Sequence, residues 1–515
     1  MNILDQIHAS EDYQQQLIAD PYRPGYHFAI PGDNGCPGDP NGAFFADGRY
    51  HLMYLYRNHH ENAFHWGHIS SHNLICWRRH PDALTVENGD GGCYSGGAFV
   101  DDDGTAYITF WKFPAVNNNP DCGGIALACS RPPYDVWERM EPIAVESNSD
   151  VWGVTDLEVN GKTIHVGSAD PSNIWKDGEY YYMQTGNLPV LNEYGRKDDS
   201  EKEYRGGWND LFRSRDLKNW EYCHRFFARP EDGYDVPDDT EDSMCSSFLP
   251  LADKMADGKL TNKYLQLFIS HNKGAQYYVG EKDGEYFIPE KHGRFSWKDN
   301  SYFAPEALVD DRNRQISWSW LLDNDPESFF VKYGWNGTFS FPRCFWIEGD
   351  ELKMAPAEEI NLLMYNKQSY EIGSLDGFKG IETKNGESFR LTAEIVANNS
   401  RKFGFRVRAE KDMSEYTEIG IDSEKGVLYF DAEHSGTMGR NIVEEAPFTI
   451  PKDGKVKLDI FVDKSIVEVY ANDCQAICRR IFPTNPQKAT FVSAFAQGAC
   501  FSEVKTWEMS PSNLY

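Results

Sequence analysis

The sequence predicts an all-β protein, a β-propeller followed by a β-sandwich, and three observations support this fold class. Asp-Gly turns open aromatic strands at four places before residue 290, which is a hairpin signal repeated at intervals of tens of residues. Helical periodicity is poor over the same part of the chain. From residue 387 onward the strands alternate cleanly and polar turns follow at short, even spacing. Repeated sheets at irregular spacing favour a propeller, and the even alternation favours a two-sheet sandwich.

The repeat that predicts the propeller has two parts. The first is the Asp-Gly turn with its aromatic strand, at residues 47–50, 103–107, 177–180 and 283–286. Three of these units are followed by a Ser and then a Trp six or seven residues later, in the pairs Ser71 and Trp77, Ser130 and Trp137, and Ser214 and Trp220. The alternating segment 315–320 supplies a strand of a fifth unit.

We expect three segments along the chain. Residues 1–355 form the propeller, residues 356–368 a joining helix, and residues 369–515 the sandwich. A second helical pattern covers residues 3–18. Two charge-rich stretches, residues 192–205 and 230–242, are expected to be surface loops of the propeller.

Composition limits the classes of partner and compartment. A chain of 515 residues is too long for one ordinary core, and a net charge of −29 argues against nucleic-acid or anionic-membrane partners. The N-terminus lacks a signal-peptide pattern, and no apolar run approaches the ~18 residues of a membrane span. The 11 cysteines show no CxxC pair, which fits reduced thiols better than disulfides or zinc. We therefore expect a cytoplasmic protein without a metal or cofactor.

The first candidate site is the Asp-Pro-Asn-Gly segment at residues 39–42, next to the strand pattern at residues 49–56. A tight Pro/Asn/Gly turn is rigid and can hold the short carboxylate of Asp39 still in front of a substrate. Taken alone, such a segment is more often only a turn.

Further segments, in a fixed order, change that interpretation. They are residues 66–70 with Leu74 and Trp77, 94–98, 170–175, 302–305, 341–343, 463–470 and 480–483. Together with residues 39–42 they resemble glycoside hydrolase family 32, the invertases, inulinases and levanases, over essentially the whole chain. The fold of that family, a five-bladed propeller plus a β-sandwich, agrees with the pattern described above.

The resemblance implies a retaining β-fructofuranosidase-like hydrolase that releases a terminal fructosyl unit from a small saccharide. Asp39 matches the family nucleophile, and Asp170 matches the carboxylate that binds substrate hydroxyls and supports the transition state. A retaining enzyme also needs a carboxylic acid roughly 5–5.5 Å from the nucleophile. No metal or cofactor is implied.

The proton donor is not where the family has it. The family Glu aligns with Met244, just before the segment 245–251, and a methionine cannot protonate a leaving group. Glu241, three residues earlier, and Glu306, at a position where the family usually has Gln, are equal alternatives. Asp242 is a third. Whichever acts needs a raised pKa, which apolar surroundings and the charge of Asp39 can supply.

Other positions point to the substrate. Motif membership or position predicts sugar contacts for Asn41, Trp66, His68, Ser95, His271, Gln276 and Trp320. Gly38 and Ala169 replace the Asn and Arg that the family carries beside its two aspartates. These replacements leave open a shifted specificity, as an arabinofuranosidase, a fructosyltransferase or a fructose-dianhydride enzyme. Met244 leaves open an inactive sugar-binding protein. Formation of a homo-oligomer is a further open alternative.

Overall fold

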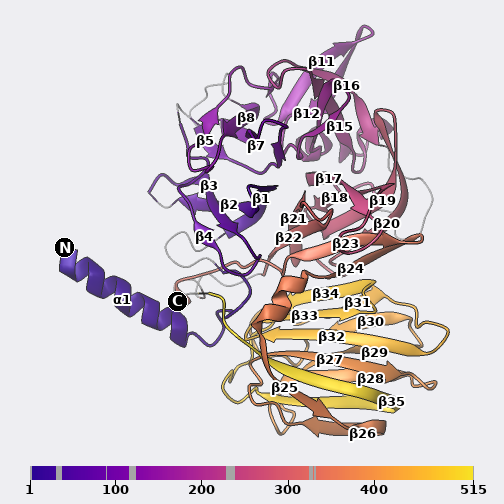
Figure 1. The fold of residues 1–515 in the computed structure, drawn as a ribbon. Helices are drawn as coiled ribbons and strands as arrows, with labels where there is room; N and C mark the ends of the chain where they lie inside the picture. Colours follow the sequence, from indigo (N-terminus) through magenta and orange to yellow (C-terminus); the bar gives the residue numbers. More distant parts are fainter. Residues whose placement is uncertain are drawn as a thin grey trace.

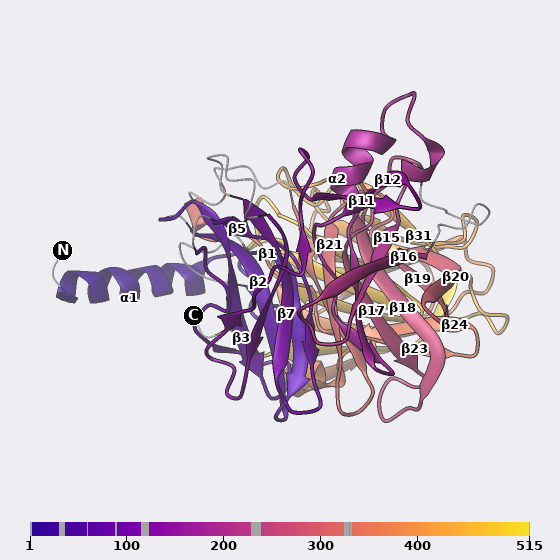
Figure 2. The same cartoon turned by 90° about the horizontal axis from the view of Figure 1, so that it is seen from above.

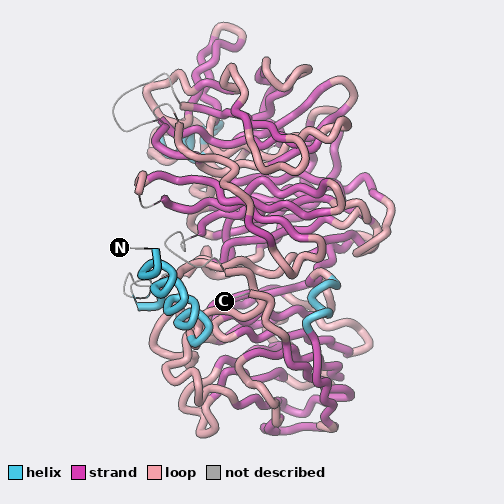
Figure 3. Tube along the Cα trace, turned by 60° about the vertical axis from the view of Figure 1, so that its left-hand side comes forward, coloured by secondary structure: helices cyan, strands magenta, loops and turns pink. Residues whose placement is uncertain are grey.

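The computed structural model describes residues 3–29, 37–58, 60–87, 90–114, 123–227, 238–323, 329 and 332–513. Most of these residues lie in strands, and the chain forms a propeller stacked on a second β body (Figure 1). Helices are confined to the N-terminal segment and a few short turns (Figure 3). The predicted all-β fold class, a five-bladed propeller followed by a β-sandwich, is confirmed.

Five antiparallel blades make up the described part of the propeller. Blade I contains β1 (Pro37–Ala46), β2 (Arg49–Asn58), β3 (Ala63–Ser71) and β4 (Arg78–Arg79). Blade II contains β5 (Asp90–Cys93), β6 (Ala98–Val100), β7 (Ala106–Pro114), β8 (Gly124–Ser130), β9 (Glu138–Arg139) and β10 (Val145–Glu146). Blade III contains β13 (Trp175–Asp177), β14 (Tyr180–Thr185), β15 (Asn209–Ser214) and β16 (Trp220–Phe227). Blade IV contains β17 (Met244–Ala252), β18 (Leu260–Ser270), β19 (Gly274–Asp283) and β20 (Tyr286–Arg294). Blade V contains β21 (Tyr302–Val309), β22 (Gln315–Leu321), β23 (Arg343–Glu348) and β24 (Glu351–Pro356).

The hairpin signal in the sequence forms the turns it predicts. Asp47 and Gly48 both have positive φ, 51° and 67°, and they join β1 to β2 with Ala46 paired to Arg49. Two successive left-handed residues define a type I′ turn, whose twist matches that of the flanking strands. The alternating segment 315–320 lies in β22, so the fifth unit is also confirmed.

A hairpin between two blades and an insertion within blade III, between β14 and β15, add to the propeller, and the insertion carries most of the short helices. The hairpin β11 (Val154–Val159) and β12 (Lys162–Gly167) separates blades II and III. After β14, the chain forms α2 (Leu188–Val190), a π-helical turn (Leu191–Gly195) and a 3₁₀ turn (Lys202–Tyr204). The stretch 192–205 is therefore partly helical, and Tyr204 is buried in it, because its ring packs in a small core with Trp208. Of the second predicted loop, residues 230–237 lie outside the described residues.

The N-terminal helix α1 (Ile3–Ala19) confirms the helical pattern there, and it projects from the propeller (Figure 2). Its last turn is anchored by Leu17, which is buried beside Tyr22 and Trp335. The joining segment is a 3₁₀ helix (Glu358–Leu363), in which Ile360 and Leu363 are buried.

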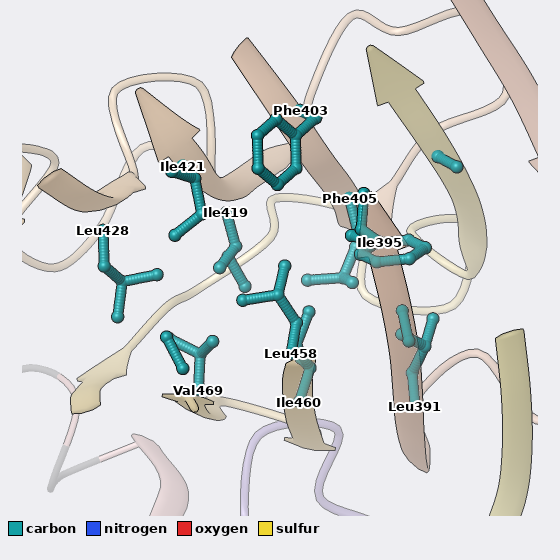
Figure 4. Packing of buried hydrophobic residues seen from close by; sticks show 14 of the residues in the cluster. Leu391, Ile395, Phe403, Phe405, Ile419, Ile421, Leu428, Leu458, Ile460 and Val469 are labelled. Carbon is teal, nitrogen blue, oxygen red and sulfur yellow. The ribbon is translucent and has the colours of Figure 1, made fainter. Parts of the chain in front are cut away.

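The C-terminal body is one sheet folded into two layers. Its strands are β25 (Met364–Tyr370), β26 (Gly373–Ile381), β27 (Ser388–Val396), β28 (Lys402–Ala409), β29 (Thr417–Asp422), β30 (Val427–Asp431), β31 (Val443–Pro447), β32 (Lys455–Asp463), β33 (Ile466–Ala471), β34 (Gln475–Arg480) and β35 (Phe491–Met509). The long strand β35 pairs with β26 and β28 near its start and with β25 and β27 near its end, so it belongs to both layers. Leucine, isoleucine, valine and phenylalanine side chains fill the space between the layers (Figure 4).

The two bodies share a core. Phe341 and Phe345 of the propeller pack with Phe461, Ile466 and other apolar residues of the sandwich. Buried ion pairs cross the same boundary. A mixed apolar and ionic interface of this kind holds the two bodies in one arrangement.

Candidate active site

The innermost strands of neighbouring blades are tied to one another by hydrogen bonds that run around the propeller. The bonds are Gly42 N to Gly96 O (3.2 Å), Thr109 Oγ1 to Ser172 O (2.8 Å), Phe248 N to Asn173 Oδ1 (2.7 Å), Ser247 Oγ to Glu306 Oε2 (3.1 Å) and Ala43 N to Glu306 Oε1 (2.8 Å). Each bond joins one blade to the next, from blade I to blade V and back. The residues just before this ring in each inner strand therefore come together at one end of the propeller.

Four of these inner segments carry a residue with left-handed backbone near their start. The residues are Gly42 (φ 53°), Asp170 (φ 38°), Cys245 (φ 48°) and Ala304 (φ 45°). In β1, β17 and β21 they coincide with register shifts against the neighbouring strand. A bulge re-aims side chains and is common next to active sites. Gly42 is required at its position, since a Cβ there would lie 2.6 Å from the Met53 sulfur.

Asp39 and Asp170 come together around one cysteine. Ser95 Oγ donates a hydrogen bond of 2.5 Å to Asp39 Oδ2. The Cys245 sulfur lies 3.7 Å from Asp39 Oδ2 and 3.6 Å from Asp170 Oδ2. The two carboxylates therefore flank a single thiol. We call Asp39, Ser95, Asp170 and Cys245 the carboxylate site.

The two acids of this site are close together, so ionisation of one opposes ionisation of the other. Burial raises the pKa of Asp39, and the hydrogen bond from Ser95 opposes that effect. Burial, followed by the charge of Asp39, raises the pKa of Asp170 to about 7. Two close carboxylates titrate as a pair, and the second resists ionisation. The pair therefore holds part of a proton at neutral pH in the absence of substrate.

A histidine and its own carboxylate lie beside the site. His271 Nδ1 is 2.7 Å from Asp242 Oδ2, and the His271 backbone N–H donates to Asp242 Oδ1 at 3.1 Å. The His271 side chain is 46% exposed, whereas that of Asp242 is fully buried. Burial lowers the pKa of His271, but the hydrogen bond and charge of Asp242, then the charges of Asp170 and Asp39, raise it overall. The charges of Asp39 and Asp170 therefore act on His271.

Glu241 is held in an ion pair. Its two oxygens accept from the Arg294 guanidinium at 3.1 Å each, and Gln276 Nε2 donates to Glu241 Oε2 at 2.7 Å. The Glu241 and Arg294 side chains are 3% and 7% exposed. A bidentate arginine holds a carboxylate in one orientation. This arrangement suits a structural role.

Glu306 closes the ring of inner strands. It is buried, and its oxygens accept from Ala43 N and Ser247 Oγ, which joins blades IV, V and I. Burial raises the pKa of Glu306 to about 8. Ala43 is four residues beyond Asp39 on β1, past the bulge at Gly42. No interaction joins Glu306 to Asp39 or Asp170 in the described part of the chain.

The other predicted sugar contacts fall into two groups. Asn41 accepts from Gly96 N at 3.3 Å and donates to the Asp39 carbonyl at 3.2 Å, so it fixes the turn that carries Asp39. Trp320 is partly exposed, lies edge-on to Phe303 with centroids 6.1 Å apart, and its indole N–H has no partner among the described residues. Ser95 and His271, described above, also line this end of the propeller.

The second group is buried away from the site. Trp66 is fully buried and donates to the Tyr94 carbonyl, and Gln276 is fully buried between Glu241 and His292. His68 is fully buried within blade I, where its Nε2 lies 2.9 Å from His51 Nδ1. In the described residues, none of these three side chains contacts the carboxylate site.

His51, His68 and His80 form a buried cluster that the sequence did not reveal, with ring nitrogens within 4.8 Å of one another. The rings of His68 and His80 stack at 4.2 Å with an interplanar angle of 19°. Because lone pairs lie in the ring planes, stacked rings do not aim them at one ion. Both His80 nitrogens are also engaged, by Ser70 and Asp135. The cluster is better described as a hydrogen-bonded core of blade I.

Met244 and Ala169, which stand where the family has Glu and Arg, pack in the core. Met244 is 1% exposed and lies against Gly186, while Ala169 is fully buried and packs on Gly153. The residue of β17 that faces the two carboxylates is Cys245, which sequence reasoning missed. The sequence contained a signal for Cys245. Neighbours along a strand face opposite sides, and the preceding residue, Met244, is apolar and expected to face the core, so Cys245 is expected to face the other way.

Comparisons with known proteins agree with this architecture. Residues 27–356 match the family model described as "Glycosyl hydrolases family 32 N-terminal domain", and residues 360–508 match "Glycosyl hydrolases family 32 C terminal". A sucrose-6-phosphate hydrolase of Zymomonas mobilis subsp. mobilis is 24% identical over 535 residues, covering 100% of this chain and 97% of that protein. A levanase of Bacillus subtilis is 26% identical over 515 residues, covering 91% of this chain and 67% of that protein.

Solved structures share the fold. The crystal structure of fructan 1-exohydrolase IIa from Cichorium intybus superposes with a TM-score of 0.76 at 21% identity, covering 96% of this chain and 98% of that one. The family models together span nearly the whole chain, from residue 27 to residue 508. The chain belongs to glycosyl hydrolase family 32.

Proposed function

We propose that this protein, a β-fructofuranosidase-like glycoside hydrolase, releases a terminal fructosyl unit from a small saccharide with retention of configuration. The observation that carries the proposal is the approach of Asp39 and Asp170 around Cys245, at the end of the propeller where the inner strands begin. Cleavage of a fructoside passes through an oxocarbenium-like state, which a carboxylate nucleophile and a second carboxylate can stabilise.

Asp39 is the proposed nucleophile. Ser95 holds one carboxylate oxygen, Oδ2, and Asn41 ties the backbone of the turn to blade II. A nucleophile fixed in this way approaches the anomeric carbon without losing further conformational freedom. Asp170 is proposed to bind the fructosyl hydroxyls and to stabilise the positive charge that develops on the ring.

The proposed sugar contacts are Asn41, Ser95, His271 and Trp320, in agreement with their places near the carboxylate site. For Trp66, His68 and Gln276, burial favours a role in supporting the surrounding strands. Glu241 and Glu306 remain the sequence-based candidates for the proton donor, although their hydrogen-bond partners favour an anchoring role for each.

The substrate proposed is a short fructoside. Structures of similar proteins include a fructan 1-exohydrolase IIa in complex with 1-kestose and a Bombyx mori β-fructofuranosidase in complex with sucrose. No helix among the described residues is long and apolar enough to cross a membrane. Action in the cytoplasm, absence of a metal requirement and formation of a homo-oligomer stay predictions.

Product analysis tests this proposal. The protein is incubated with sucrose, 1-kestose, sucrose 6-phosphate and an aryl arabinofuranoside, with methanol added as a second acceptor. We expect fructose from at least one fructoside, and methyl β-fructofuranoside as the sign of retention. Asp39→Asn should lower turnover by at least about 10⁴-fold.

Asp210→Asn is the matched control, because Asp210 is a buried aspartate of blade III whose carboxylate accepts from Gly167 N of the β11–β12 hairpin. Its activity per folded molecule should be unchanged. Cleavage of the arabinofuranoside alone, or fructose release that survives Asp39→Asn, would contradict the proposal. Binding of sucrose without turnover of any saccharide would instead identify a sugar-binding protein.

A further inference from the structure

The reaction proposed above lacks a well-placed proton donor. The family position is Met244, which is buried in the core. Glu241 is bound by Arg294, and Glu306 is bound between Ala43 and Ser247, so neither side chain is free to reach the glycosidic oxygen. A leaving group that is an ordinary sugar alcohol departs slowly unless it receives a proton.

His271 and Asp242 provide an acid–base pair at this place. Both His271 contacts to Asp242 are hydrogen bonds, one through Nδ1 at 2.7 Å and one through the backbone N–H at 3.1 Å. Asn300 Nδ2 donates to the His271 carbonyl at 2.8 Å, which fixes the backbone from the other side. A carboxylate on Nδ1 sets the tautomer and orientation of an imidazole, and it leaves Nε2 as the reactive nitrogen.

The pair is placed between buried and exposed surroundings. Asp242 is fully buried at the entry to β17, three residues before Cys245, whereas the His271 ring is 46% exposed and lies edge-on to Phe303. Phe303 in turn contacts the partly exposed Trp320. The imidazole therefore adjoins an aromatic edge that can take the leaving sugar, and its partner Asp242 is three residues before Cys245 of the carboxylate site.

We propose that the imidazole of His271, oriented by Asp242, is the proton donor and acceptor of the hydrolysis. The inference rests on the proposed function and names a catalytic residue for it. The first step breaks the bond between C2 of the fructosyl unit and the leaving oxygen, whose electron pair takes the proton from His271 Nε2. Asp39 forms the new bond to C2.

The second step reverses these roles. Water attacks C2, its proton passes to the neutral Nε2 of His271, and the bond from C2 to Asp39 breaks to return the carboxylate. The two steps leave fructose, the leaving saccharide and the enzyme with its starting protons. Nothing beyond water is consumed.

The charges around the ring are consistent with this role. Asp242, Asp170 and Asp39 face His271 as anions or shared acids, and together they raise the pKa of the imidazole above its usual 6.5 against the effect of burial. Arg196 Nη2 lies 3.8 Å from Asp242 Oδ1 and partly offsets the negative charge of that carboxylate. Formation of the bond to Asp39 removes one of these charges and so lowers the pKa of His271, which favours the neutral imidazole that must accept the proton of water in the second step.

Leaving-group dependence tests the proposal. We expect His271→Gln to lower kcat/KM on sucrose by about 10²–10⁴-fold. The same variant should lose far less in the first step on β-fructofuranosyl fluoride, whose leaving group needs little protonation. Azide should restore turnover of the fluoride by forming fructosyl azide. The alkaline limb of the pH–rate profile should disappear, and Asp242→Asn should move it to lower pH.

His165→Gln is the matched control, because His165 also pairs through Nδ1 with an aspartate, Asp156 at 2.7 Å, but on the separate β11–β12 hairpin. It should keep the wild-type profile on both substrates. Equal losses on sucrose and the fluoride for His271→Gln, or a retained alkaline limb, would overturn the proposal. The same would follow if Glu306→Gln, Glu241→Gln or Asp170→Asn gave the azide-rescued pattern.

The two proposals fail in different ways. If wild-type protein cleaves fructosides through Asp39 and His271→Gln behaves as wild type, only the assignment of His271 fails. If Asp39→Asn keeps full activity, or no fructoside is cleaved, the proposed function itself fails.

Discussion

The carboxylate site and the propeller–sandwich interface both bury acidic side chains, but the acids at the interface are paired with arginine. At the carboxylate site, Asp39 and Asp170 have a hydroxyl and a thiol as neighbours, and burial raises both pKa values. At the interface, Asp299 and Glu444 share Arg479, with contacts of 3.0 Å and 2.5 Å. Burial acts to raise the pKa of Asp299, but Arg479 and Arg440 lower it to about 2. Burial raises the pKa of the more deeply buried Glu444, and Arg479 opposes that effect.

This difference separates stabilising charge from reactive charge. An acid paired with arginine gains from being ionised and contributes to the folded state. An acid buried without a cation is held at a cost to stability and is ready to react when a positive transition state forms beside it. The four predictions below follow from this contrast.

The largest effect is expected at the interface. Arg479→Ala leaves Asp299 and the fully buried Glu444 without their shared cation, and it should lower the free energy of unfolding by about 3–5 kcal/mol. Urea denaturation measures this loss. Lys162→Ala, which removes exposed contacts to Glu201 and Glu203, is the control and should leave the unfolding midpoint nearly unchanged. Equal effects of the two variants would contradict the contrast.

The next effect is a pH-dependent gain at the carboxylate site. The pKa of Asp170 rises from an unfolded value near 3.8 to about 7, so the native state binds more protons and loses stability as pH rises through that window. Asp170→Asn should therefore raise the free energy of unfolding at pH 8 by on the order of 1–3 kcal/mol, and with it the melting temperature. Near pH 4 the gain should be small.

Asp299→Asn is its matched counterpart. Because the folded pKa of Asp299 is about 2, its stabilising contribution is present above pH 4 and is lost as pH falls through 2. This variant should lower the melting temperature at pH 8. If both asparagine variants shift the melting temperature in the same direction, the proposed difference between the two regions is wrong.

A loss of stability of similar size is expected at Gly42, where backbone geometry shapes the site. Gly42 has φ 53°, and a Cβ there would lie 2.6 Å from Met53 Sδ and 3.0 Å from Trp66. Gly42→Ala should destabilise the protein by about 1–3 kcal/mol and displace Asp39, lowering kcat more than KM changes. Gly48→Ala tests the left-handed backbone alone, since nothing lies within 4 Å of a Cβ at Gly48. An unchanged kcat for Gly42→Ala would separate the bulge from the placement of Asp39.

The smallest effect is expected at Glu306. Its raised pKa means that it carries a proton at neutral pH, so Gln is a close neutral replacement that still accepts a hydrogen bond. Glu306→Gln should change the free energy of unfolding, and the activation free energy calculated from kcat/KM, by less than about 1 kcal/mol each. Glu306→Ala should lower the free energy of unfolding by about 1–3 kcal/mol, because it leaves Ala43 N and Ser247 Oγ without their partner. Thermal melts and kcat/KM on one fructoside distinguish the two. A large loss of kcat in Glu306→Gln alone would restore Glu306 as the proton donor.

The sequence alone predicted most of the fold and part of the candidate site. The Asp47-Gly48 turn, the Trp-rich strands and the alternation after residue 387 are local signals, and the structure follows each of them. The expected joining helix formed as a 3₁₀ segment, since it is short and buries only Ile360 and Leu363. Asp39 and Asp170 were identified because the order of motifs fixes them within the inner strands.

The sequence by itself predicted the repeat and the two bodies, because these depend on local turn chemistry and on strand patterns, and its resemblance to the family pointed to Asp39 and Asp170. Only the tertiary structure decided which partners the other acids have. Arg294, 53 positions after Glu241, holds that side chain, and Ala43, 263 positions before Glu306, holds the other. It also brought His271 to Asp242 and Cys245 between the two aspartates. Such contacts join residues far apart in the chain, and the propeller closure that creates them has no local signal.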